Sequence, residues 1–133
     1  MLIRVIKYCK NHKKTIKIIF SCIVICLHVN CSKVPKITDF DVEVWKNDQF
    51  GCEGNRLKLA EVLEQQRHEL KMIEEPELKK ILGTPNSIQI MQRQQRYYIY
   101  WIQNPAKCLD TNMVYKELKI RVSALGKVTE VLF

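Results

Sequence analysis

The first thirty residues of this chain differ in kind from everything that follows them. Six basic residues and no acidic residue lie before Ile18, and the run from Ile18 to Val29 is apolar except for Ser21 and His28. A helix needs roughly 20 apolar residues to cross a bilayer core, so this run is short for a membrane span. A basic start followed by a short apolar core is typical of an export signal. The part left to fold as a domain is then roughly a hundred of the 133 residues.

Cys31 directly follows the apolar run, in the sequence LHVNC of residues 27–31. This sequence resembles a lipobox, where signal peptidase cuts a bacterial lipoprotein before its acylated cysteine, although Asn30 replaces the usual smaller residue. The resemblance implies that residues 1–30 are a signal peptide and that Cys31 carries the lipid. Two or three acyl chains give a stable membrane anchor. Ser32, in place of an aspartate that marks inner-membrane retention, favours the outer membrane. The alternative is an uncleaved signal anchor in the inner membrane.

The net charge of the chain comes mainly from this N-terminal segment. The total is +8, but all six charges before residue 31 are positive, which leaves sixteen basic against fourteen acidic residues in the remainder. A nucleic-acid-binding domain needs a basic face on its folded part. The remainder offers only scattered pairs such as Arg93 and Arg96. We therefore expect no nucleic-acid partner.

Cysteine positions favour an oxidising compartment. Three of the six cysteines lie in the predicted signal peptide and a fourth is Cys31, so Cys52 and Cys108 remain as a pair. We expect them to form a disulfide that closes a loop of about 57 residues and contributes roughly 4 kcal/mol of stability. The alternative is two free, buried thiols. A metal site that combines them with His68 is less favoured, because the close ligand spacing of zinc sites is missing.

The sequence after Cys31 divides into a lead-in and a domain. Residues 31–50 are expected to be a tether and an extended segment that docks through Phe40, Val42 and Trp45, and residues 51–133 to be the folded domain. Helical spacing of apolar residues predicts a helix over residues 56–72 with Asn55 as its N-cap. A second helix is predicted over residues 76–82, before Gly83. Alternating patterns predict antiparallel strands over residues 88–92, 96–103, 116–122 and 128–133.

The strand over residues 96–103 carries two aromatic rows. Tyr97, Ile99 and Trp101 lie on one face, and Tyr98, Tyr100 and Ile102 lie on the other. Because two helices can cover only one face of a small sheet, we expect one row to be exposed or bound to a partner. We place the row with Trp101 in the core, because bulky rings flank its isoleucine, and assign partner binding to Tyr98, Tyr100 and Ile102. The alternative is that the segment from Phe40 to Trp45 covers the second face and buries both rows.

Residues suited to catalysis are scarce after Cys31. His68 is the one histidine there and is expected on a helix surface, and the three serines have no histidine and carboxylate pattern around them. The glutamates at positions 74, 75 and 77 are explained by the start of a helix, whose dipole favours acidic residues. No glycine-rich phosphate loop is present. We expect a protein that is not an enzyme, with no cofactor, no metal and no small-molecule substrate.

Three motifs together resemble the BamE-like (SmpA/OmlA) lipoprotein domain. They are LKKILGTP at residues 78–85, RYYIYW at 96–101, and LKIRVSALGKVTEV at 118–131. The resemblance covers residues 56–133 and differs in residues 72–74, where the family usually has glycine, methionine and threonine. It implies an α+β fold with two N-terminal helices packed on one face of a three- to four-stranded antiparallel sheet. The same fold occurs in the repeats of proteinaceous β-lactamase inhibitors.

The sequence thus favours an outer-membrane lipoprotein with a protein-binding or scaffolding domain in the periplasm. Its expected partners are the membrane, through the lipid on Cys31, and an envelope protein, and a link to outer-membrane protein assembly follows from the resemblance. The alternative is an inhibitor module that inserts a loop into an enzyme. The segment from Asn104 to Asn112 offers the longest loop for that purpose.

Overall fold

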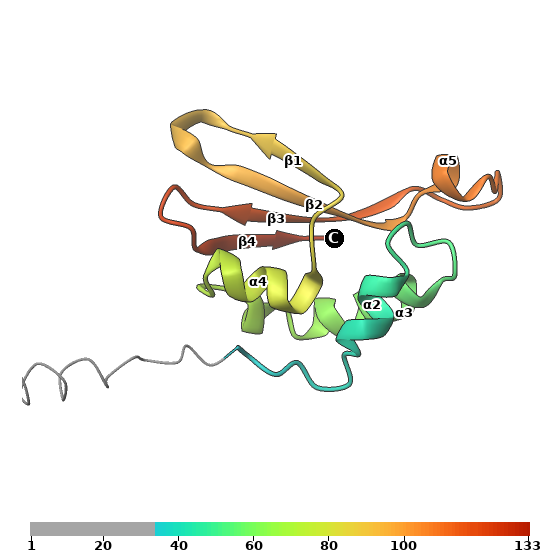
Figure 1. Ribbon diagram of the computed structural model, residues 1–133, viewed down its shortest axis with the longest axis horizontal. Coiled ribbons are helices and arrows are strands. Elements are labelled where there is room, and N and C mark those ends of the chain that lie inside the picture. The colour runs from blue at the N-terminus through green and yellow to red at the C-terminus, as the bar shows by residue number, and fades with distance from the viewer. Residues whose placement is uncertain (1–33) are drawn as a thin grey trace, which may run out of the picture. The chain divides into compact units, whose positions relative to one another are not determined.

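Four antiparallel strands form one sheet in which neighbours in space are also neighbours in the chain. They are β1 (Ser87–Ile90), β2 (Arg96–Gln103), β3 (Lys116–Val122) and β4 (Val128–Leu132). The computed structural model describes residues 34–133 (Figure 1), so the predicted signal peptide and the lipidation of Cys31 lie outside the described residues. Within residues 34–133, no helix has the length and apolar character needed to cross a membrane.

Short helices precede the sheet and lie on one side of it. They are α2 (Val42–Asn47), α3 (Asn55–Gln65), the 3-10 turn η1 (Arg67–Leu70) and α4 (Glu75–Leu82). Two further short helices, η2 (Gln92–Gln94) and α5 (Pro105–Cys108), connect strands. Figure 1 shows α2, α3 and α4 together on one side of the sheet. The predicted α+β fold, with helices against an antiparallel sheet, is confirmed.

The core lies between these helices and the face of the sheet that we call the inner face. On β3, Leu118, Ile120 and Val122 are fully buried, in keeping with the alternation of the strand. The register pairs Tyr100 with Leu118 and Tyr98 with Ile120, and directly paired residues share a face. The helical segments contribute Trp45, Ala60, Leu63, Leu70, Leu78, Ile81 and Leu82 to the same cluster.

The lead-in docks on the domain, but as a helix and not as the extended segment predicted. Asp41 begins α2, since its Oδ1 accepts hydrogen bonds from the backbone N–H groups of Glu43 and Val44, each at 3.0 Å. Trp45 is fully buried, and its indole N–H donates to the carbonyl of Leu82 at 3.2 Å. Phe40 contacts the Trp45 ring, with centroids 5.5 Å apart. Because Asp41 caps its first turn, the segment that was predicted to be extended forms the helix α2.

The first long helix ends earlier than the spacing of leucines predicted. α3 stops at Gln65, η1 follows, and Met72 adopts a left-handed backbone with φ of 67°. The chain then runs beside the start of β4, where the Met72 N–H donates to the Val128 carbonyl and the Val128 N–H donates to the Ile73 carbonyl, at 2.9 and 3.0 Å. These backbone bonds satisfy groups that a longer helix would have used internally.

Candidate functional site

The row predicted to bind a partner lies in the core, so that prediction was wrong. Tyr98, Tyr100 and Ile102 are 1%, 0% and 3% exposed and belong to the inner face. Tyrosines fit there because their hydroxyls reach the rim of the core, where polar partners are available. The hydroxyl of Tyr100 donates to the carbonyl of Gly83 at 3.2 Å. Burial, with a hydrogen bond to Glu75, raises the pKa of Tyr98 to about 12.

The other row, Tyr97, Ile99 and Trp101, lies on the opposite face, which we call the outer face. The lead-in does not cover this face, because Phe40 and Trp45 join the inner-face core, so that alternative is also wrong. Ile99 is nevertheless 4% exposed, whereas Tyr97 and Trp101 are half-buried. On the outer face, the neighbours of this row across the sheet are charged residues of β3. The register places Trp101 opposite Glu117, Ile99 opposite Lys119 and Tyr97 opposite Arg121.

Polar side chains on the outer face form a linked set. The hydroxyl of Tyr97 donates to Oε2 of Glu130 at 3.0 Å, and Nη1 of Arg121 lies 3.8 Å from the same oxygen. Nε of Arg121 donates to Gln95 at 2.8 Å. Exposed pairs of this kind contribute little to stability, commonly less than about 1 kcal/mol each. They show that Tyr97, Arg121 and Glu130 lie together on this face.

One end of the outer face carries three rings, which we call the aromatic patch: Phe50, Trp101 and Tyr115. The rings of Phe50 and Trp101 lie with centroids 5.9 Å apart, and Phe50 and Tyr115 are 41% and 50% exposed. The hydroxyl of Tyr115 donates to Oε2 of Glu117 at 2.5 Å. Partial burial, together with this hydrogen bond, raises the pKa of Tyr115 to about 12. The phenol therefore stays protonated and is a hydrogen-bond donor at neutral pH.

Glu117 is the charged member beside the patch. Nζ of Lys119 lies 2.6 Å from its Oε1. Burial opposes its ionisation, but the hydrogen bonds from Lys119 and Tyr115 outweigh that effect and lower the pKa of Glu117. The patch thus combines exposed rings with a fixed carboxylate. A groove of about 850 Å³ adjoins it, lined by Tyr115 and Glu117 and by residues of α3 that include Leu57 and Glu61.

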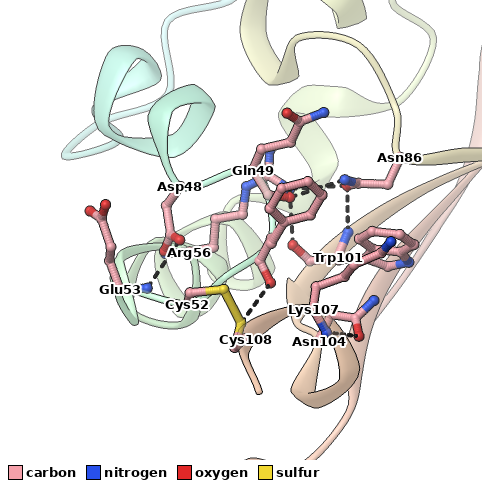
Figure 2. Close-up of a disulfide and its surroundings, with 11 residues drawn as sticks. Asp48, Gln49, Cys52, Glu53, Arg56, Asn86, Trp101, Asn104, Lys107 and Cys108 are labelled. Carbon is pink, nitrogen blue, oxygen red and sulfur yellow. Dashed lines mark hydrogen bonds between the residues drawn. A yellow bond between two sulfur atoms is a disulfide. The ribbon is translucent and has the colours of Figure 1, made fainter. Parts of the chain in front are cut away.

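A disulfide fixes the loop that carries Phe50. Cys52 and Cys108, the pair expected from the sequence, are joined with their Cα atoms 5.2 Å apart (Figure 2). The backbone N–H of Asn104 donates to the carbonyl of Phe50 at 3.1 Å. Gly51 has φ of 72°, and a Cβ there would overlap the carbonyl of Ile102. The loop therefore lies directly against the end of β2, next to Trp101.

Arg56 is the buried centre of this end of the domain. Its guanidinium donates to the carbonyls of Trp45, Gln49 and Trp101, each at 2.9 Å, and to Oδ1 of Asn86 at 3.1 Å. It also lies 4.7 Å from the centroid of the Trp45 ring. Burial lowers the pKa of Arg56 to about 10, so the group remains charged at neutral pH. Figure 2 shows Arg56 between the lead-in and the end of β2 that bears Trp101.

Other candidates from the sequence do not gather into a catalytic arrangement in the described part of the chain. His68 is exposed, and its Nε2 lies 3.3 Å from Oε1 of its neighbour Glu69. The Glu77 carboxylate accepts from the Glu74 N–H at 3.0 Å and completes a capping box at the start of α4. Over residues 34–133, no three metal-binding side chains lie close enough to hold an ion.

The aromatic patch is thus the feature that sequence reasoning missed. Phe50 stands in a turn far from β2 in the sequence, so no local pattern predicts that its exposed ring lies beside Trp101. Comparison with known protein families, curated proteins and solved structures found no match to this chain.

Proposed function

We propose that this protein is a lipid-anchored envelope protein whose domain binds another protein through the outer face of its sheet. The observation that carries the proposal is the aromatic patch of Phe50, Trp101 and Tyr115, in which the rings of Phe50 and Tyr115 are 41% and 50% exposed. Tryptophan and tyrosine are enriched at the energetic centres of protein interfaces. They offer large rigid rings with a polar group, at a small cost in side-chain entropy.

The way the patch is held supports binding without rearrangement. The disulfide between Cys52 and Cys108 and the buried contacts of Arg56 fix the segments that carry Phe50 and Trp101. A rigid site loses little conformational entropy when it binds. A disulfide also fits an oxidising compartment such as the periplasm. We therefore propose a non-catalytic scaffold domain of the BamE-like type that a lipid on Cys31 anchors in the outer membrane.

The binding surface can be tested by photocrosslinking in intact cells of the source bacterium. A photoreactive phenylalanine analogue at Tyr115 should give a discrete adduct with an envelope protein, and the same analogue at the exposed Lys58 of α3 should not. Adding Trp101→Ser should remove the adduct while the circular dichroism spectrum stays unchanged. Equal adducts from both positions would contradict the proposed surface, and adducts with soluble enzymes alone would favour an inhibitor.

The anchor needs a separate measurement. Mass spectrometry of the mature protein should find an N-terminus at Cys31 that carries acyl chains. An intact Met1 would refute both the cleavage and the outer-membrane location. This result does not depend on which face of the sheet binds a partner.

A further inference from the structure

The first strand, β1, is an open edge of the sheet. Among residues 34–133 it pairs only with β2, and it lies outermost in Figure 1. The N–H of Met91 donates to the carbonyl of Gln95 at 2.8 Å and closes the hairpin. Hydrogen-bonded and non-hydrogen-bonded pairs alternate along an antiparallel ladder. The backbone polar groups of Ile88 and Ile90 therefore point away from β2, toward the open edge.

This edge is short, with four residues, but it lacks the other protection that edge strands usually have. Natural sheets blunt their edges with short strands, charged residues, prolines, bulges or a covering segment. The opposite edge has such cover, since the segment at Met72 and Ile73 hydrogen-bonds to the start of β4. The sequence of β1, from Ser87 to Ile90, has no charged residue and no proline.

Apolar side chains flank the open edge on the inner-face side. Ile88 and Ile90 are 50% and 80% exposed. The register pairs Ile88 with Tyr98 and Ile90 with Arg96, so both isoleucines share the side of the sheet that carries the helices. The exposed backbone groups and apolar side chains together form a site for an extended segment that contributes both hydrogen bonds and apolar contacts.

Basic groups surround this edge. Arg96, opposite Ile90, and Lys79 both lie near the Tyr98 ring, at 5.9 and 5.5 Å from its centroid. Both pair with the same carboxylate, that of Glu75, and therefore leave an excess of positive charge. Arg93, in the turn of the hairpin, is exposed and forms no ion pair among the described residues. A second copy of the chain would bring the same basic groups to the contact, so charge complementarity favours an acidic partner over self-association.

We propose that β1 accepts an extended segment of a partner protein, with alternating apolar and acidic residues, as a fifth strand of the sheet. The segment's backbone pairs with Ile88 and Ile90, its apolar side chains pack on theirs, and its carboxylates face Arg93, Arg96 and Lys79. This surface is separate from the aromatic patch, and the inference does not rest on that patch.

Fluorescence anisotropy with synthetic peptides tests the inference on the full chain in dodecyl maltoside micelles. The probe is a short labelled peptide that alternates valine with glutamate, and its counterpart carries lysine in place of glutamate. We expect the glutamate peptide to bind about tenfold more tightly than the lysine peptide or better, with a preference that weakens as salt is added. Equal binding of the two peptides, or no binding of either, would overturn the proposal.

Two variants locate the binding at β1. Ile90→Pro removes an N–H at the open edge without removing a hydrogen bond to β2, and we expect it to weaken binding of the glutamate peptide about tenfold or more. Ile90→Glu, at a side chain exposed enough to tolerate the change, should do the same by repulsion. Leu125→Glu, in the exposed turn between β3 and β4, is the matched control and should bind like the unmodified chain.

The variants also separate the remaining outcomes. Unchanged binding in folded Ile90→Glu would overturn the proposal, whatever the fate of the proline variant. Self-association of the peptide-free protein that Ile90→Glu abolishes would overturn it in favour of a second copy. Loss of peptide binding in Ile90→Glu, with the photocrosslink from Tyr115 retained, would support strand addition as a separate activity.

Discussion

Replacing Arg56 with alanine tests whether one buried guanidinium holds the lead-in against the sheet. The change removes the donor to three backbone carbonyls and to Asn86. A hydrogen bond to a charged group contributes about 1.5–3 kcal/mol, but four bonds to one group do not add. Water can reach some of the acceptors once the side chain is gone. We therefore expect the free energy of unfolding to fall by about 3–5 kcal/mol, the range for breaking a buried charged network.

Arg56→Lys refines this prediction. Lysine retains the charge, but its single ammonium group cannot replace the planar guanidinium, which donates in several directions at once. We expect a loss of about 2 kcal/mol, between the unmodified chain and the alanine variant. The matched control is Arg67→Ala, because Arg67 is exposed on η1 and should change stability by less than about 0.5 kcal/mol.

Equilibrium urea unfolding, followed by tryptophan fluorescence, measures these differences. The Trp45 ring lies beside the Arg56 guanidinium, so its emission reports on this part of the core. If Arg56→Ala lowers the free energy of unfolding by less than about 1 kcal/mol, the assigned role is refuted. The four hydrogen bonds together would then contribute no more than one ordinary hydrogen bond.

Three further predictions concern the bridge, the core row and pH. The double variant Cys52→Ser/Cys108→Ser should lose about 4 kcal/mol, seen as a lower urea midpoint, and an unchanged midpoint would show that the bridge does not constrain the unfolded chain. Tyr100→Ala should lower the free energy of unfolding by about 3–5 kcal/mol, whereas Tyr100→Phe should lower it by about 1 kcal/mol, both measured by urea unfolding. An alanine variant as stable as the unmodified chain would contradict the burial of this ring. Hydrogen bonding to Lys79 lowers the pKa of Glu75 below its ordinary value of 4.5 in the folded state, so its stabilising contribution is present above that value and is lost as pH falls through the folded pKa. Glu75→Gln should therefore flatten the decline of the melting temperature with acid, and an identical decline would contradict the assignment.

The order of helices and strands was predictable because periodicity is a local property. β3 illustrates this, since alternating Leu118, Ile120 and Val122 correctly marked its inner face. The end of α3 was less accessible to the sequence. Apolar spacing continues past Gln65, and only the backbone bonds of Met72 and Ile73 to Val128 explain why the helix stops. Those bonds come from a segment more than fifty residues away, and no local pattern reports them.

The sequence predicted the two rows of β2 correctly, but the row predicted to face the core faces outward, and the row predicted to face outward lies in the core. Alternation defines which residues share a face, not which face is inward. Ring size was a poor guide, because Tyr100 finds a polar partner at the rim of the core and Trp101 is covered on one side by Phe50. The register with β3 would have settled the choice, since Tyr98 lies opposite Ile120. That register is a pairing between two strands, and the sequence of one strand does not reveal it.

The order of the strands has a consequence for how the domain reaches its fold. A sheet whose spatial order equals its chain order can grow by successive hairpins, each closing a short loop. The distant contacts are of another kind: the bridge between Cys52 and Cys108, and the bond from Arg56 to Trp101. We expect the hairpins to protect their amides from hydrogen exchange before the helices dock, because closing long loops costs more chain entropy. We therefore expect attachment of the N-terminal helices to be slower than formation of the hairpins.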